Sequence, residues 1–316
     1  MKIVVTDGYT LNSSGLSWAE LEKLGEFENY DYTSAEQTLQ RCKDADIVIT
    51  NKVVFDESVM QSLPNLKFIT VTATGHDIID IQTARRKHIP VSNVPAYSTH
   101  SVAQMVFAHI LELAFHIGHH SETVKQGKWS NCENFCYWDR PLTELAGLTI
   151  GIIGFGKIGQ ATARLADAFG MNIIAYHTHE IHDAKVEPVA LERLFAASDI
   201  VSLHCPLKAD NEKMVNADML RLMKPTAWLI NTSRGQLVDE RALVDALNNG
   251  QIAGAGLDVL ATEPPEHDNP LLSAKNCYIT PHMAWGTQAS LKRLMGITIG
   301  NVKGFIDGNP QNLVTL

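Results

Sequence analysis

The chain has 316 residues, of which 45% are hydrophobic and 19% are charged, a length and composition sufficient for two globular domains with complete cores. Its formal net charge of −9 argues against nucleic acid or an anionic membrane as the main partner. No apolar run reaches the length of a membrane span, and the N-terminus has the pattern of a strand and turn rather than of a signal peptide. Five scattered cysteines favour a reducing environment, so we predict a cytoplasmic protein.

Strands and helices alternate through residues 1–100, which predicts a parallel α/β sheet. The expected strands are residues 2–6, 46–50, 67–72 and 90–93. The expected helices are residues 16–24, 35–42, 58–63 and 81–87.

A long apolar helix is expected from residue 101 to residue 124, with Ser101 as its N-cap and Gln104 completing a capping box. Apolar residues cover much of its circumference, so we expect it to be buried between domains or subunits. Residues 129–141, WSNCENFCYWDRP, follow as an irregular aromatic stretch of the kind found at interfaces and lids.

Two groups of side chains raise the question of a metal site. Cys132 and Cys136 have no further cysteine or histidine nearby in zinc-like spacing. His116, His119 and His120 lie near the end of the long helix, where a solvated or subunit-facing surface explains them without a ligand. We therefore predict no bound metal, with the histidine group as the weaker alternative.

A strand, a glycine loop, a helix and a second strand follow one another between residues 149 and 176. The loop GFGKIG fits the pattern G-x-G-x-x-G through Gly154, Gly156 and Gly159. In such units the first glycine permits a tight turn, the second lets the backbone approach a pyrophosphate, and the third allows close packing of helix and strand. The helix N-terminus faces the phosphates. In this context the pattern predicts a dinucleotide site.

The residue that follows the second of these strands departs from the pattern for NAD. An acidic residue about 20 positions beyond the loop usually holds the ribose hydroxyls, but His177 stands there, without an arginine or lysine to bind a 2′-phosphate. Thr178 or Glu180 would serve a ribose, and a protonated His177 or His179 would serve a phosphate. We favour NAD as the cofactor and keep NADP as the alternative.

Further strands are expected at residues 200–204, 227–231, 253–258 and 277–280, and further helices at 191–197, 217–222, 241–248 and 288–306. Six strands then follow Ala146, which is enough for one complete dinucleotide-binding domain. The residues before Ser101 form a separate α/β domain, to which the C-terminal helix is expected to return.

Ligands of open α/β sheets bind beyond the carboxyl ends of the strands, and three reactive residue types follow strands in the second half of the chain. Arg234 offers a planar fork for a carboxylate and polarises a neighbouring carbonyl. His282 can exchange a proton with the substrate oxygen, and Glu263 would orient the ring and stabilise its positive charge. Each residue alone has an ordinary structural explanation, as a turn residue, a core histidine or a loop acid. Together they suit hydride transfer to a 2-oxo acid.

The chain resembles the D-isomer-specific 2-hydroxyacid dehydrogenase family, and most of all its glycerate dehydrogenase (hydroxypyruvate reductase) branch. The matching segments are 73–77 (ATGHD), 93–99 (NVPAYST), 101–104 (SVAQ), 154–159, 231–235 (NTSRG), 258–265 (DVLATEPP) and the segment bearing His282. The resemblance implies two doubly wound, parallel-sheet α/β domains. A Rossmann NAD(P)-binding domain, residues 101–285, is expected as an insertion in a flavodoxin-like substrate-binding domain formed by residues 1–100 and 286–316.

The resemblance also implies roles for individual residues. Arg234, Glu263 and His282 match the catalytic arginine, glutamate and histidine of the family. Thr74 and Gly75 match the loop that meets the substrate carboxylate, and Trp285 resembles the glycerate and hydroxypyruvate enzymes. Cofactor contacts are expected for Gly154, Gly156, Lys157, Ile158, Gly159, His177, Thr178, Cys205, Pro206, Asn211, Thr232, Ser233, Arg234 and Asp258. Family members are commonly dimers joined through the nucleotide domain, which implies a homodimer.

The predicted function is the reversible reduction of hydroxypyruvate or glyoxylate to D-glycerate or glycolate, with hydride from NAD(P)H and a proton from His282. One alternative is a D-lactate-type or broad 2-oxoacid reductase. A second is a dinucleotide-sensing protein, because certain transcriptional corepressors resemble this family and keep the same three residues. Those proteins tend to carry disordered extensions, whereas two domains account for nearly all of this sequence, which favours the enzyme.

Overall fold

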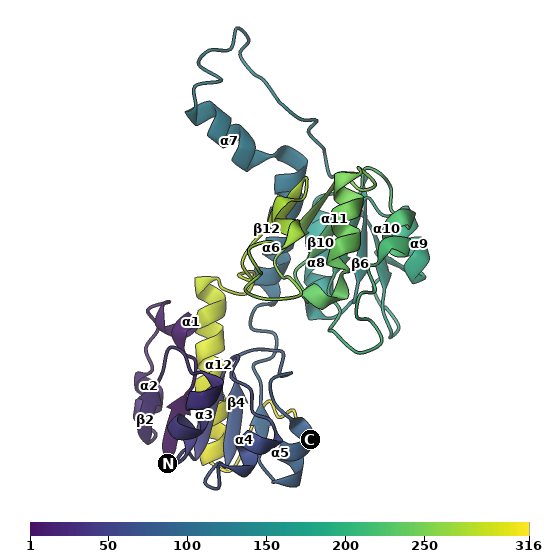
Figure 1. Cartoon of the computed structure of the whole chain (residues 1–316). Helices are drawn as coiled ribbons and strands as arrows, with labels where there is room; N and C mark the ends of the chain where they lie inside the picture. The colour runs from purple at the N-terminus through teal and green to yellow at the C-terminus, as the bar shows by residue number, and fades with distance from the viewer. Residues whose placement is uncertain (316) are drawn as a thin grey trace. The chain divides into compact units, whose positions relative to one another are not determined.

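Figure 1 shows the computed structural model, which describes residues 1–315 and contains two compact units. One unit joins Met1–Ser98 to the segment that begins at Gly286, and the other is Thr99–Trp285. Each unit has a parallel sheet of its own. The predicted fold class, two α/β domains built on parallel sheets, is confirmed.

The first unit carries a five-stranded parallel sheet in the order β2-β1-β3-β4-β5, the order of flavodoxin-like sheets. Its strands are β1 (Lys2–Val5), β2 (Glu26–Asn29), β3 (Ile47–Thr50), β4 (Phe68–Val71) and β5 (Val91–Ser92). Every residue of β3 and β4 is buried, as expected for strands covered on both faces. The sequence does not predict β2, because the residues EFEN are mostly polar and lie half-exposed at the sheet edge.

The helices of this unit are α1 (Tyr9–Asn12), α2 (Ala19–Glu22), α3 (Ala35–Cys42), α4 (Glu57–Gln61), α5 (Ile81–Arg86) and α12 (Gln288–Ile306). The bounds of α3 and α12 match the predicted ranges. The helix predicted at 16–24 is shorter, because the chain closes onto β1 at Gly25, where a Cβ atom would lie 2.0 Å from the Met1 carbonyl oxygen. The C-terminal helix α12 packs on β4, with Phe305 stacked on Phe68 at 4.6 Å between ring centroids.

The second unit carries a seven-stranded parallel sheet in the order β12-β11-β10-β9-β6-β7-β8. Its strands are β6 (Thr149–Ile153), β7 (Asn172–Tyr176), β8 (Val186–Pro188), β9 (Ile200–Leu203), β10 (Trp228–Asn231), β11 (Gly254–Leu257) and β12 (Cys277–Ile279). The strand order reverses between β6 and β9, which is the point at which such sheets bind ligands. The six predicted strands were one too few, because β8 is a short edge strand that ends in Pro188 and buries only Val186.

The helices of the second unit are α6 (Thr99–Phe115), α7 (Ile117–Lys125), α8 (Lys157–Ala168), α9 (Leu191–Ala197), α10 (Ala217–Leu222) and α11 (Glu240–Asn248). Two short 3₁₀ helices, η1 (Gly235–Leu237) and η2 (Pro270–Ser273), follow β10 and β11. Across residues 1–315 no single helix is long and apolar enough to span a membrane, and only α6 and α7 taken together, bent by 58°, reach that length and composition.

The long helix predicted at 101–124 is two helices, because His116 adopts a left-handed backbone conformation (φ 50°) between α6 and α7. The first helix begins at Thr99, so Ser101 lies inside it rather than capping it, and its hydroxyl donates to the Ala284 carbonyl. Within its own unit α6 packs against α8, β10 and β11, and the predicted burial of this helix between domains or subunits stays a prediction. In contrast, α7 buries none of its residues, and Figure 1 shows α7 and the following loop extending away from the seven-stranded sheet.

Candidate active site

The glycine loop leaves β6 at the switch point of the seven-stranded sheet. Gly154 has a φ of 95°, and a Cβ atom on it would lie 2.6 Å from the backbone nitrogen of Cys205, the second residue after β9. A Cβ atom on Gly159 would lie 2.3 Å from the Gly154 carbonyl oxygen. Both glycines are therefore required by close backbone contacts within the fold.

Gly156 differs from these two glycines, because a Cβ atom on it would meet no atom within 4 Å. It is the N-cap of α8, so the open space lies at a helix N-terminus, where free N–H groups and the helix dipole favour a phosphate. The hydroxyl of Thr232, directly after β10, is buried without a hydrogen-bond partner among residues 1–315. The open helix end after β6 and the unpaired polar atom after β10 lie on either side of β9 at one edge of the sheet, and both fit a dinucleotide.

Hydrogen bonds hold the loop after β9 in shape, and one of them joins it to the loop after β10. Ser233 donates its hydroxyl hydrogen to the Cys205 carbonyl at 2.6 Å. Asn211 donates to the Pro206 carbonyl at 2.9 Å and accepts from the Lys208 backbone at 2.7 Å. Burial raises the pKa of the Cys205 thiol, so this cysteine stays protonated at neutral pH. These bonds give the loop a defined shape beside the switch point.

His177 follows β7 at the position where the family usually has an acid. Its Nδ1 accepts the backbone N–H of Phe155, in the glycine loop, at 3.2 Å. Burial, assisted by the neighbouring His179, lowers the pKa of His177, so its ring is neutral at neutral pH. The expectation that a protonated His177 would bind a phosphate is therefore disfavoured. Thr178 and Glu180 are exposed beside it.

The loop after β12 brings His282 against Glu263, which lies in the loop after β11. Nδ1 of His282 is 2.6 Å from Oε2 of Glu263, and the other carboxylate oxygen accepts the backbone N–H of Leu260 at 3.1 Å. The anchored carboxylate therefore holds the hydrogen on Nδ1 and leaves Nε2 for a ligand. The two side chains are 28% and 33% exposed, so the pair is accessible to a small molecule.

Arg234 follows β10 at the same edge of the sheet. Its backbone carbonyl accepts from the Asn231 side chain at 2.8 Å, and its guanidinium donates to the Ser233 carbonyl at 2.9 Å. The next residue, Gly235, packs its backbone directly on Leu260, whose carbonyl carbon would lie 1.9 Å from a Cβ atom at position 235. This contact joins the Arg234 turn to the segment that leads to Glu263.

Two further expected residues lie in the first unit. The Thr74 hydroxyl donates to the Val94 carbonyl at 2.9 Å, and the Asn93 side chain donates to the Thr74 carbonyl at 2.7 Å. Next to Gly75, Nδ1 of His76 is buried with no hydrogen-bond partner among the described residues. Asn93 and Val94 thus hold the loop at residues 74–76 in shape, and the loop contains the buried, unpartnered Nδ1 of His76.

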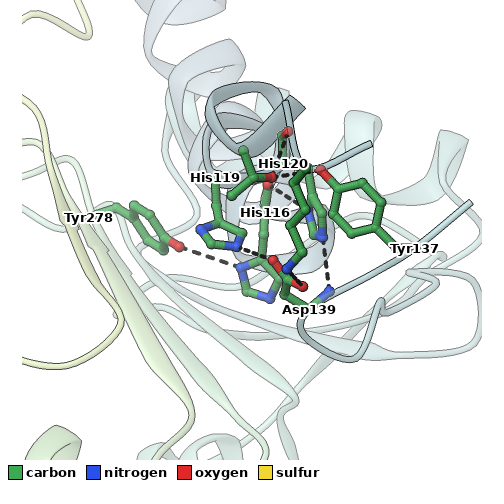
Figure 2. Close-up of polar contacts among 8 residues, drawn as sticks. His116, His119, His120, Tyr137, Asp139 and Tyr278 are labelled. Carbon is green, nitrogen blue, oxygen red and sulfur yellow. Dashed lines mark hydrogen bonds and ion pairs between the residues drawn. The ribbon is translucent and has the colours of Figure 1, made fainter. Parts of the chain in front are cut away.

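The histidines near the end of the long predicted helix take part in a polar cluster that ties α7 to the loop after it (Figure 2). Nε2 of His119 is 2.8 Å from Oδ2 of Asp139, whose other oxygen is paired with Lys128. These two partners hold the pKa of the Asp139 carboxyl below its usual range. His120 accepts the Asp139 backbone N–H at 3.3 Å. Within residues 1–315 no group of three or more histidine, cysteine or acidic side chains is arranged to hold a metal ion.

Comparisons with known proteins place this geometry in context. Residues 107–284 match the family model described as the NAD-binding domain of D-isomer specific 2-hydroxyacid dehydrogenases. The chain is 47% identical over 320 residues to a hydroxypyruvate reductase of Blautia hydrogenotrophica, covering 99% of each protein. It is 39% identical over 292 residues to a glycerate dehydrogenase of Methylorubrum extorquens, covering 92% of each. A solved structure of an acyclic imino acid reductase in complex with NADPH and D-Arg superposes with a TM-score of 0.88 at 32% identity, covering 99% of this chain and 100% of the other.

Gly156 and Gly159 form a matched pair for substitution. Gly159→Ala would place a methyl group 2.3 Å from the Gly154 carbonyl oxygen, so we expect the free energy of unfolding to fall by about 1–3 kcal/mol. Gly156→Ala meets no atom within 4 Å, so we expect the melting temperature to fall only slightly, because alanine is a poorer N-cap than glycine. Its methyl group would nevertheless keep a pyrophosphate from the backbone, and we expect NADH binding to weaken about tenfold.

Thermal unfolding and a fluorescence titration with NADH measure the two effects separately. A Gly156→Ala protein that binds NADH as tightly as the wild type would contradict the placement of the phosphates at the start of α8.

Proposed function

This chain belongs to the D-isomer specific 2-hydroxyacid dehydrogenase family, and we propose that it reduces hydroxypyruvate, and also glyoxylate, to the corresponding 2-hydroxy acid with a nicotinamide dinucleotide. The observation that carries this proposal is the Glu263–His282 pair, 2.6 Å apart, at the sheet edge that also holds Arg234 and the glycine loop. The substrate class is supported by the names of the relatives, a hydroxypyruvate reductase and a glycerate dehydrogenase. We assign the dinucleotide to the seven-stranded unit and a substrate-binding role to the first unit, through Thr74 and Gly75.

The bound dinucleotide supplies a hydride to the carbonyl carbon of the substrate. The guanidinium of Arg234 binds the substrate carboxylate and draws electron density from the neighbouring carbonyl. Protonated His282 donates the Nε2 proton to the carbonyl oxygen as that oxygen gains negative charge. Glu263 keeps the other ring nitrogen protonated and offsets the positive charge that the ring carries before it gives up its proton. In the reverse direction neutral His282 accepts the hydroxyl proton of the 2-hydroxy acid.

We propose that NADH is the preferred cofactor and that NADPH is also accepted. The ring of His177 is fixed by the Phe155 N–H and is neutral at neutral pH. It therefore lacks the carboxylate that would repel a 2′-phosphate, and it also lacks the positive charge that would attract one. This position is thus expected to discriminate weakly between the two dinucleotides.

A homodimer is proposed as the working assembly, with α7 and residues 126–141 as the contact region. Every residue of α7 is at least partly exposed, and large aromatic side chains follow it, with Phe135 90% exposed and Trp138 64% exposed. Apolar surface of this kind is typical of protein interfaces. The Asp139 cluster in Figure 2 holds the same region in a defined shape before a partner binds. A second copy of this chain supplies a partner with the same aromatic surface.

His282→Ala tests the catalytic assignment. Without the proton donor, we expect kcat for hydroxypyruvate reduction to fall by about 10²–10⁴-fold, while the Kd for NADH stays near the wild-type value. The matched control is His267→Ala, which removes an exposed histidine from the loop after Glu263 and is expected to leave turnover unchanged. Steady-state kinetics and fluorescence titration give both values, and a His282→Ala enzyme with normal turnover would rule out the proposed proton transfer.

His177→Asp tests the cofactor assignment. The new carboxylate would accept the ribose hydroxyls and repel a 2′-phosphate, so we expect the ratio of the Kd for NADPH to that for NADH to rise about tenfold. His182→Asp adds the same charge at an exposed site nearby and serves as the control. An unchanged Kd ratio in His177→Asp would show that residue 177 does not face the ribose.

The combined change Phe135→Asp and Trp138→Asp tests the assembly. We expect the wild-type chain to have the mass of a dimer by light scattering after size-exclusion chromatography, and the variant to have that of a monomer, because buried charges at the contact are costly. Leu272→Asp places a charge at another exposed apolar residue and should leave the dimer intact. A double variant that remains a dimer would refute this contact region.

A further inference from the structure

The segment that carries His282 is held from two points on α6. Ser101 donates its hydroxyl hydrogen to the Ala284 carbonyl. Further along the same helix, Nε2 of His109 lies 3.1 Å from the hydroxyl oxygen of Thr280. Ser101 and His109 are 5% and 4% exposed, and the other buried residues of α6 are all apolar. Polar side chains this deeply buried need hydrogen-bond partners, and both find theirs in the His282 segment.

Asp258, directly after β11, accepts hydrogen bonds from Thr280 and Ala284, the two residues that α6 contacts. Its carboxylate is buried, with 1% of the residue exposed. One oxygen accepts the Thr280 hydroxyl at 2.6 Å and the Met283 N–H at 3.0 Å, and the other accepts the Ala284 N–H at 2.8 Å. The family resemblance predicts Asp258 at the cofactor, and the structure adds that both of its carboxylate oxygens accept hydrogen bonds from the His282 segment.

The carboxylate of Asp258 accepts hydrogen bonds, and this fixes the direction of the two hydrogen bonds that run from His109 through Thr280 to Asp258. Because the Thr280 hydroxyl gives its hydrogen to Asp258, it accepts from His109, and the Nε2 of His109 carries the hydrogen. Burial lowers the pKa of His109, although the nearby charge of Asp258 opposes that effect, so the ring is the neutral donor that this arrangement requires. The sheet makes room for the ring at Gly256, where a Cβ atom would lie 2.6 Å from Cβ of His109.

The backbone of His282 explains why such anchoring is needed. His282 has a φ of 49°, in the left-handed region that non-glycine residues rarely adopt. Its backbone nitrogen lies 2.8 Å from the Asp258 carbonyl oxygen and 2.9 Å from the Thr280 carbonyl oxygen. Such a conformation persists only where the surrounding structure holds it, and it is concentrated at functional sites.

We propose that Asp258, Thr280 and His109 are positioning residues for the reaction, which together hold the left-handed turn of His282 and so aim its ring at the substrate carbonyl. None of the three touches the reacting atoms in this role; they act through the backbone of the His282 segment, with Ser101 as a second anchor. The inference rests on the proposed role of His282 as proton donor. A displacement of a catalytic group by about 1 Å can reduce turnover about 10²-fold, so a loss of anchoring should appear in kcat.

Thr280→Val and Thr280→Ser form the central test. Valine keeps the shape of the side chain and removes the hydroxyl, whereas serine keeps the hydroxyl and removes only the methyl group. We expect Thr280→Val to lower kcat for hydroxypyruvate reduction by about 10–100-fold, and Thr280→Ser to stay within about threefold of the wild type. The Kd for NADH should change by less than about threefold in both variants.

A merely structural role would lower the melting temperature without changing the chemistry of the folded enzyme. We therefore also measure the primary deuterium isotope effect on kcat with NADH labelled at the transferred hydrogen. It should rise in Thr280→Val, because a misaligned proton donor slows the chemical step relative to product release. Wild-type kcat with an unchanged isotope effect in Thr280→Val, or a Thr280→Ser enzyme as slow as Thr280→Val, would overturn the proposal.

His109→Leu and His109→Gln provide the second pair. Glutamine retains an N–H donor, whereas leucine fills the space without one, so we expect leucine alone to lower kcat. The double variant His109→Leu and Thr280→Val should be no slower than Thr280→Val, because His109 acts through the Thr280 hydroxyl. If the two losses in kcat add in the double variant, His109 does not act through Thr280. If Thr280→Val does not fold, the His109 pair carries the same test.

His282→Ala in the same assays separates this inference from the proposed function. Retained turnover in His282→Ala would overturn the role of His282 as proton donor and, with it, the positioning role, while reduction of hydroxypyruvate itself would stand. Loss of turnover in His282→Ala, with Thr280→Val at the wild-type rate, would overturn the positioning role alone.

Discussion

Parallel pairing directs the carboxyl ends of all seven strands of the second unit to one edge of its sheet. Residues far apart in the chain, among them Gly154, Arg234 and His282, share that edge because each follows a strand. The reversal of strand order between β6 and β9 marks the point of this edge at which such sheets bind ligands. Close backbone contacts at Gly154 and Gly235 then bring neighbouring loops together. The proposed chemistry depends on this constraint, since no single loop carries the groups it requires.

A parallel sheet places loops at a common edge but does not set the orientation of a side chain within a loop. For His282 that orientation comes from two sources. Glu263 holds the ring through Nδ1, and the carboxylate of Asp258 holds the backbone segment. The buried helix α6 supports the second source through His109 and Ser101. In this account α6 contributes to the active site without supplying a residue that reacts.

The sequence predicts those features whose physical cause is local. Continuous apolar runs locate β6, β9 and β10, and the glycine loop is found because its pattern lies between a strand and a helix. Other features depend on contacts that are distant in sequence. Ser101 has the local pattern of a helix cap, yet its partner Ala284 is 183 residues away, and His109 meets Thr280 across 171 residues. The sequence does contain a signal for these two contacts, because Ser101 and His109 are polar residues in a mostly apolar helix. The left-handed break at His116 has only a weak signal, because histidine is enriched among non-glycine residues with positive φ but adopts that conformation at few of its positions.

The most direct test of the account is the rate of NADH and NADPH oxidation measured side by side with hydroxypyruvate, glyoxylate and pyruvate. We predict turnover with hydroxypyruvate and NADH at a kcat in the ordinary enzymatic range, about 1–10³ s⁻¹, slower turnover with pyruvate, and measurable activity with NADPH. Tight binding of either dinucleotide with no oxidation in the presence of any of the three acids would contradict it, and would favour a dinucleotide-sensing protein instead.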